Sequence, residues 1–280
     1  MRLGYNTNGF AHHRLEDAFA ILADIGYQSV AVTLEHDLLD PPDRRAVAGA
    51  VERLTPLVDR SGLAVTIETG SRFTLDPWRK HQPTLISGAE EGRRKRLEFL
   101  QAATDVAAEL RAESMSLWSG AADDHADERA LNVRLTEGLR ELLDYAGEKS
   151  VRLAFEPEPA MFIDTMAKFA RLHADLSHPL FGLTLDVGHI HCLRDGSAAH
   201  HIRQWRDVLW NVHIEDMRRG IHEHLMFGEG DMAFAPIFEA LREMDYVGPV
   251  HVELSRHSYD AVNAARMAFE YLRPLGQECA

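Results

Sequence analysis

Short apolar runs alternate along this chain with longer segments in which apolar residues recur every three or four positions. The first run, 2–6, is followed by Leu15, Phe19 and Leu22 at helical spacing. A short apolar or β-branched run predicts a buried strand, and the three-to-four spacing predicts an amphipathic helix. The predicted strands lie at 2–6, 29–34, 64–67, 114–117, 152–155, 181–185, 210–214 and 249–252.

A predicted helix follows each of these strands, and glycine or proline marks many of the boundaries. Pro41 and Pro42 are predicted to open the second helix. The predicted helices cover 15–25, 41–57, 93–111, 130–146, 165–176, 198–207, 234–244 and 259–272. Two long polar segments, 71–88 and 215–232, are predicted to be loops, and loops of that length are often functional.

Eight strand-helix units in 280 residues give 35 residues per unit, enough for a strand, a helix and two connections. Alternating strands and helices predict a parallel sheet. No glycine-rich dinucleotide fingerprint follows the first strand. The sequence therefore predicts the α/β class and a single-domain (β/α)8 TIM barrel over residues 1–280.

Composition narrows the environment and the partners that we expect. The net charge of −14 disfavours binding to nucleic acid, which needs a basic face. No apolar run approaches the roughly 20 residues that cross a bilayer, and the N-terminus lacks the apolar core of a signal peptide. With only two cysteines as well, we expect a cytoplasmic protein without nucleic-acid or membrane partners, and the sequence leaves open whether it is a homo-oligomer.

Chemistry-bearing side chains stand at the ends of four consecutive predicted strands. They are Glu156, Asp186, His213 and Glu253. In a barrel of this kind the active site forms at these strand ends. One acidic residue there is usually a helix cap or an ion-pair partner, but four converging ligands predict a metal site. Three carboxylates and one imidazole suit Mn²⁺, Mg²⁺, Co²⁺ or Zn²⁺.

Several short motifs in the C-terminal half occur together. They are Ala154-Phe155-Glu156-Pro157, Leu185-Asp186-Val187-Gly188-His189, Val212-His213-Ile214-Glu215-Asp216, His224 followed by Gly228-Glu229-Gly230-Asp231, and Tyr246-Val247-Gly248-Pro249 running into Val252-Glu253. With these motifs the chain resembles the xylose isomerase-like superfamily of sugar phosphate isomerases and epimerases, which also contains the AP endonuclease family 2. The N-terminal half matches only in its alternation of strands and helices.

The resemblance implies a function and assigns roles. Glu156, Asp186, His213 and Glu253 would hold one catalytic divalent metal, and Glu156 and Glu253 would be the acid/base pair. The implied activity is a metal-dependent isomerase or epimerase of a sugar, sugar phosphate or cyclitol that transfers a proton through a metal-stabilised enediolate. The alternatives are a metal-dependent lyase or dehydratase on a keto-sugar or keto-cyclitol, and an AP-endonuclease-like phosphodiesterase. A small carbohydrate or cyclitol is the expected partner.

His189, His222 and His224 admit three interpretations: substrate contact, a second metal site, or structural hydrogen bonds. We favour substrate contact for His189, by resemblance to the isomerase branch. The AP endonuclease branch of the superfamily, which binds three zinc ions, also uses histidines after earlier strands. Here the third and fourth strands end in Glu68-Thr69-Gly70 and Trp118-Ser119-Gly120, which weakens the phosphodiesterase interpretation.

Further candidate substrate contacts lie on the loops. Glu158 stands two residues after Glu156. Arg219 lies where epimerases of the superfamily often place a substrate-binding arginine, and Arg218 is the alternative. Arg79, Lys80 and His81 are candidates for binding a phosphate or carboxylate, and Trp118 for stacking on a sugar. Solvated loop charges, and packing at the rim for Trp118, are the alternatives.

Overall fold

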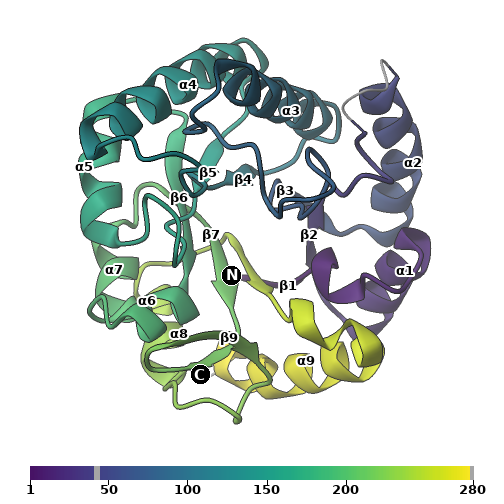
Figure 1. The fold of residues 1–280 in the computed structure, drawn as a ribbon. Coiled ribbons are helices and arrows are strands. Elements are labelled where there is room, and N and C mark those ends of the chain that lie inside the picture. The colour runs from purple at the N-terminus through teal and green to yellow at the C-terminus, as the bar shows by residue number, and fades with distance from the viewer. Residues whose placement is uncertain (41–44, 278–280) are drawn as a thin grey trace. The chain divides into compact units, whose positions relative to one another are not determined.

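The computed structural model describes residues 1–40 and 45–277, so the predicted helix start at Pro41 and Pro42 lies outside the described residues. Eight strands form a closed barrel in the order β1-β10-β7-β6-β5-β4-β3-β2, with helices between them (Figure 1). The barrel pairs β1–β10, β1–β2, β10–β7, β3–β4, β4–β5 and β6–β7 are all parallel. The predicted (β/α)8 fold is confirmed.

The strands of the barrel are short and almost entirely buried, because parallel strands are covered on both faces. Their bounds are β1 (Arg2–Asn6), β2 (Ser29–Thr33), β3 (Ala64–Glu68), β4 (Met115–Leu117), β5 (Leu153–Phe155), β6 (Phe181–Asp186), β7 (Leu209–Ile214) and β10 (Pro249–Val252). All eight lie where the apolar runs predict them.

The helices also follow the prediction, with ends displaced by a few residues. Their bounds are α1 (Leu15–Ile25), α2 (Ala46–Ser61), α3 (Glu90–Glu109), α4 (Glu128–Lys149), α5 (Met166–Leu176), α7 (Ala198–Gln204), α8 (Ala235–Glu243) and α9 (Ala261–Gln277). Short 3-10 helices, Thr7–Phe10 and Ser255–Asp260, follow β1 and precede α9. No helix among residues 1–40 and 45–277 is both long and apolar enough to cross a membrane.

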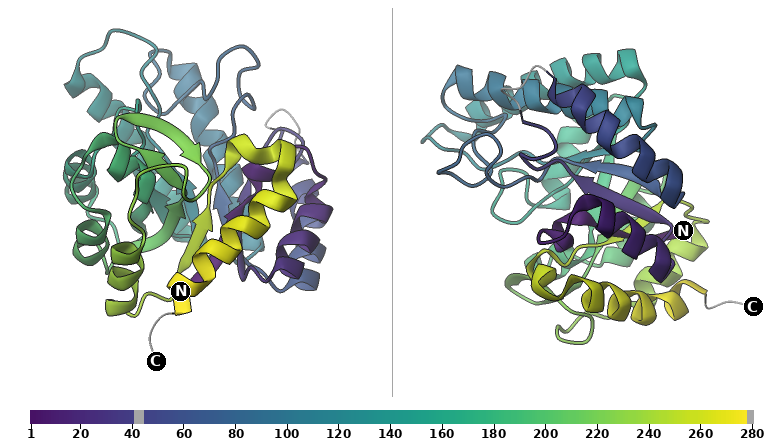
Figure 2. Two further views of the ribbon diagram at one scale, coloured as in Figure 1. Left: turned by 90° about the horizontal axis from the view of Figure 1, so that it is seen from below. Right: turned by 90° about the vertical axis from the view of Figure 1, so that its right-hand side faces the viewer.

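The chain is organised as two compact units. The first takes residues 1–32, 57–65 and those from 183 onward, and the second takes 33–56 and 66–182. In the first unit α9 packs against α1 and α8 (Figure 2). In the second unit α4 packs against both α3 and α5 (Figure 1).

Two elements of the first unit differ from the prediction. Helix α6 (Val187–Leu193) begins directly after Asp186, and the segment predicted as a loop from 215 to 232 contains an antiparallel hairpin. Its strands are β8 (Asp216–Arg218) and β9 (Ile221–Leu225). Seven residues are too few for a helical period to stand out in α6. The alternation in Ile221-His222-Glu223-His224-Leu225 is the strand signal that a polar composition concealed.

Candidate metal centre

Asp186 ends β6 and caps α6. Its Oδ1 accepts a hydrogen bond of 2.8 Å from the backbone N–H of His189, so one carboxylate oxygen satisfies the helix N-terminus. Its Oδ2 accepts no hydrogen bond of ordinary geometry and lies 3.5 Å from Nε2 of His189, although the residue is only 1% exposed. A buried, unsatisfied carboxylate oxygen costs about 1–3 kcal/mol or more, and a bound cation would remove that cost.

His213 and Glu253 come from neighbouring strands. His213 on β7 stands opposite His251 on β10, and Glu253 follows the end of β10. The Nδ1 atom of His213 lies 3.0 Å from Oε2 of Glu253, and Oε1 of Glu253 accepts a hydrogen bond of 2.8 Å from Asn8. Burial acts to raise the pKa of Glu253, but the charge and hydrogen bond of His213 outweigh it and hold that pKa well below its usual range. The carboxylate is therefore ionised.

Asp186, His213 and Glu253 offer ligand atoms that lie within 4.8 Å of one another. Two carboxylates and one imidazole at this spacing fit a hard or borderline divalent cation. Oδ2 of Asp186 would be one of its ligand atoms. Glu156 follows β5 in the second unit and is 5% exposed. Its role as a fourth ligand stays a prediction.

Glu215 is a buried acid that the sequence analysis did not single out. It is fully buried, its Oε2 lies 3.7 Å from Nδ1 of His224, and burial, followed by the nearby Asp186 and Glu253, raises its pKa well above the usual value. A Cβ on Gly188 would lie 1.9 Å from its Oε1, so a larger residue there would displace this carboxylate. Period-two alternation from His213 was the available signal, because it places Glu215 on the same strand face.

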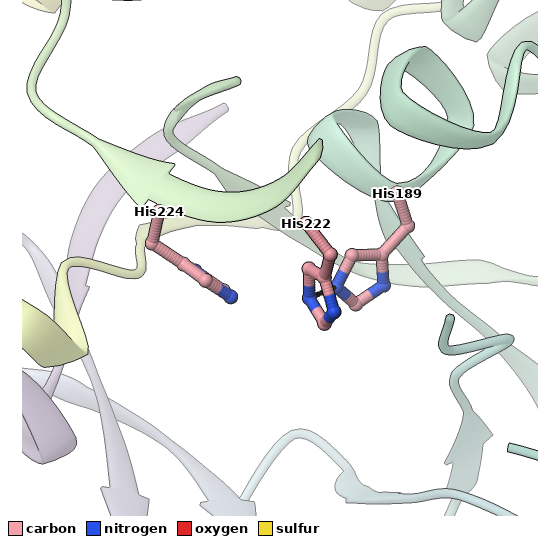
Figure 3. A group of neighbouring side chains, drawn as sticks. All are labelled: His189, His222 and His224. Atoms are coloured by element: carbon pink, nitrogen blue, oxygen red, sulfur yellow. Dashed lines mark hydrogen bonds between the residues drawn. The ribbon is translucent and has the colours of Figure 1, made fainter. Parts of the chain in front are cut away.

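Three histidines form a second cluster beside these residues. His189 lies on α6, whereas His222 and His224 lie on β9, and their rings converge on one space (Figure 3). Their ligand atoms lie within 4.8 Å of one another, and the Nε2 atoms of His189 and His222 are 3.1 Å apart. Burial lowers the pKa of His189 to about 4, so its imidazole is neutral. The Nδ1 of His224 donates to the backbone carbonyl of Glu253 at 2.9 Å. In the neutral ring, the Nε2 atom of His224 then carries no proton.

Tetrahedral Zn²⁺ with bonds of about 2.0 Å holds neighbouring nitrogens roughly 3.3 Å apart. The 3.1 Å separation of His189 and His222 is close to this value, and it also suits a hydrogen bond between the two rings. The cluster is therefore compatible with a second metal, with a substrate contact and with a structural hydrogen bond.

The predicted substrate-binding residues on the loops lie in different surroundings. Arg219 is exposed in the turn between β8 and β9, and it adds to the hydrogen bond of His191 in lowering the pKa of Asp231. Arg79 is exposed and donates to Asp76 at 2.7 Å, and Lys80 is exposed beside it. Glu158 is half-buried after β5. Their roles as substrate contacts stay predictions.

Trp118 and His81 pack around a buried arginine. Arg96 is 4% exposed, lies 5.1 Å from the Trp118 ring, and donates from Nη2 to the carbonyl of His81 at 2.9 Å. Burial, Lys80 and Arg96 lower the pKa of His81 to about 4, so this histidine is uncharged near neutral pH. Trp118 is itself only 7% exposed. These positions favour packing at the rim for Trp118, and any anion binding there would fall to Arg79 and Lys80.

Comparison with known proteins identifies the family. A family model described as xylose isomerase-like TIM barrel matches residues 19–275. L-ribulose-5-phosphate 3-epimerase UlaE of Salmonella paratyphi A is 28% identical over 121 residues, which are 43% of this chain and 42% of that protein. The match thus spans less than half the length of this curated relative.

Solved structures agree in fold. The 3-keto-D-glucoside 4-epimerase YcjR from E. coli has a TM-score of 0.78 at 19% identity, covering 98% of this chain and 99% of its own. The D-allulose 3-epimerase from Methylomonas sp., in complex with D-allulose, has a TM-score of 0.75 at 21% identity, covering 98% and 96%. The IOLI protein, solved with a zinc atom, has a TM-score of 0.77 at 16% identity, covering 99% of each chain. Identities this low show the fold alone.

Proposed function

We propose that this chain, which belongs to the xylose isomerase-like TIM barrel family, is a divalent-metal-dependent isomerase or epimerase of a sugar, sugar phosphate or cyclitol. The observation that carries the proposal is the convergence of Asp186, His213 and Glu253 at the ends of β6, β7 and β10, with an unpartnered carboxylate oxygen among them. That the named relatives are sugar epimerases supports the same reaction class.

Asp186, His213 and Glu253 would hold the cation, with Glu156 as the fourth ligand. A divalent cation at this position supplies Lewis acidity to a carbonyl oxygen and the neighbouring hydroxyl of a bound sugar. Glu253, which is ionised, would take the proton from the carbon between them, and Glu156 would return one on the opposite face. Asn8 donates to Oε1 of Glu253 and would hold that carboxylate in place.

His189 would contact the substrate as a neutral imidazole, able to donate to or accept from a hydroxyl. A second cation held by His189, His222 and His224 is the alternative for the histidine cluster. A lyase or dehydratase acting on a keto-sugar or keto-cyclitol would use the same three ligands. A lyase or dehydratase differs from an isomerase or epimerase in its product, which lacks a group that the substrate carries.

Elemental analysis of the purified protein tests the metal part of the proposal. We expect one tightly held Mn²⁺, Mg²⁺, Co²⁺ or Zn²⁺ per chain, and its loss in Asp186→Asn. Asp207→Asn is the matched control, because that side chain is 92% exposed and should leave the metal content unchanged. Two metals per chain, one of which is lost in His222→Ala, would assign a cation to the histidine cluster, and three zincs would favour a phosphodiesterase. A chain that binds no metal would contradict the proposal.

A further inference from the structure

The β8–β9 hairpin carries two of the three clustered histidines, and its ladder is too short to hold it in place alone. The hairpin joins three residues of β8 to five of β9. An isolated two-stranded hairpin is marginally stable at best in water. The positions of His222 and His224 beside His189 (Figure 3) therefore depend on what else supports the hairpin.

Asp216, the first residue of β8, supplies that support with its side chain. The residue is 2% exposed, and its carboxylate accepts four hydrogen bonds from backbone N–H groups. The donors are Met217 at 3.0 Å and Met232 at 3.2 Å to Oδ1, and Gly228 at 2.9 Å and Gly230 at 3.0 Å to Oδ2. A carboxylate has about four lone-pair positions, so all of them are used. Backbone N–H groups that converge in this way form an anion-binding site, and here the anion is the protein's own side chain.

Three of the four donors belong to the segment 226–232, which is called the belt below. Gly228 has a φ of 93°, a conformation that favours glycine. A Cβ on Gly230 would lie 2.1 Å from Oδ1 of Asp216, so a larger residue there would displace the carboxylate. The two glycines of the motif at 228–231 are therefore explained by the close approach of the belt to this side chain.

The belt is also attached to α6, the helix that carries His189. The carboxylate of Asp231 pairs with His191, which lies two residues after His189 on this helix. The hairpin turn is attached to the same helix, because the N–H of Gly220 donates to the carbonyl of Cys192 at 2.8 Å. The hairpin and α6 are therefore joined twice, once through the belt and once through the turn.

We infer that Asp216 is a positioning residue, whose carboxylate binds the hairpin to the belt and so fixes His222 on β9 against His189 on α6. The Nε2 atoms of these two rings lie 3.1 Å apart. This role rests on the proposed function, in which His189 contacts the substrate. Asp216 touches neither the cation nor the substrate in that proposal, and it acts through the two histidines.

Asp216→Asn tests this role, because it keeps the size of the side chain and replaces one acceptor oxygen by a nitrogen that only donates. We expect belt amide protons to exchange with solvent about 10-fold to 100-fold faster, the factor that a hydrogen bond to a charged group is worth. The nuclear Overhauser effect between the rings of His189 and His222 should weaken. Faster exchange with an unchanged Overhauser effect, or no change in either, would overturn the inference.

Asp127→Asn is the matched control for that experiment. Asp127 caps α4 in the second unit and accepts one hydrogen bond, from the N–H of Ala130 at 2.8 Å. Asparagine caps a helix about as well as aspartate does. This variant should leave both the belt exchange and the Overhauser effect unchanged.

Kinetics distinguish positioning from metal binding. The proposed ligands Asp186, His213 and Glu253 come from barrel strands or their ends and not from the hairpin. Asp216→Asn should therefore keep its metal and raise KM by about 10-fold, with a smaller effect on kcat, for a ketose that the protein epimerises. Loss of the metal in this variant would contradict the inference. No turnover by the unsubstituted protein would overturn the proposed function, and the Overhauser measurement would still decide the role of Asp216.

A measurement on the unsubstituted protein decides the matter if Asp216→Asn does not fold. Hydrogen exchange of the native protein at low urea concentrations shows which amides open together. We expect the amides of Gly228 and Gly230 to share one opening step with those of β9, because the Asp216 carboxylate joins the two segments. Separate opening of the belt and β9 would overturn the inference.

Discussion

The Nδ1 of His213 lies 3.0 Å from Oε2 of Glu253, across the parallel pair formed by β7 and β10. A ligand nitrogen and an ionised carboxylate in this relationship are suited to share one cation. The same carboxylate is held through its other oxygen by Asn8, which belongs to the segment that follows β1. In the proposed function, Glu253 would therefore take part in both metal binding and proton transfer.

Replacing Glu253 or Glu156 by glutamine should abolish turnover, because glutamine cannot carry the proton. Loss of a general base typically costs about 10²–10⁴-fold in rate, and loss of a ligand adds to this. The measurement is the rate of epimerisation together with metal content for each variant. Glu229→Gln, on the exposed segment after β9, is a matched control and should keep both. Robust activity in Glu253→Gln or Glu156→Gln would remove that residue from the acid/base pair.

The buried Arg96 should be the main support of the segment from 79 to 88. It donates to the carbonyls of Pro83 and His81 at 2.7 and 2.9 Å, and it contacts the rings of Phe99 and Trp118. Arg96→Met should lower the free energy of unfolding by about 2–3 kcal/mol, because two buried acceptors lose a charged donor. It should also speed amide hydrogen exchange in the 79–88 segment.

The neighbouring Arg94 provides the comparison for this prediction. Its guanidinium is about half exposed and pairs with Glu141, so Arg94→Met should cost less than about 1 kcal/mol. Similar urea unfolding curves and exchange rates for Arg94→Met and Arg96→Met would show that Arg96 has no special role.

The low pKa of His81 predicts a loss of stability in acid. Its pKa is about 4 in the folded protein and about 6.5 when unfolded, so between these values the unfolded chain binds the proton more readily. The free energy of unfolding should therefore fall as the pH drops from 6.5 to 4, by at most about 3 kcal/mol from this group. His81→Asn should reduce this pH dependence and keep the backbone, because asparagine tolerates the φ of 64° found there. Urea unfolding of both proteins at pH 7 and pH 4.5 measures how much the free energy of unfolding falls between the two pH values. An equal fall in both proteins would assign the acid sensitivity to other groups.

The strand ends were the most informative part of the sequence. Asp186 and Glu253 follow short, mostly apolar runs, so their approximate position at the rim could be predicted from the alternation of elements alone. Asn211 and His251 could not be predicted, because polar residues within a buried strand give no sign of their partners until the register is known. A single sequence likewise conceals Arg96, which occupies the buried side of a highly charged helix.

The central claim is that the metal centre promotes proton exchange at a sugar carbon, and proton NMR in deuterated water tests it directly. Metal-loaded protein is incubated with a panel of ketoses, ketose phosphates and keto-cyclitols, beside chelator-treated protein and Glu253→Gln. We predict deuterium incorporation at one carbon next to the carbonyl of at least one substrate, abolished by the chelator, restored by adding back metal and absent in Glu253→Gln. Exchange that persists at full rate after metal removal, or no exchange with any member of the panel, would contradict the account.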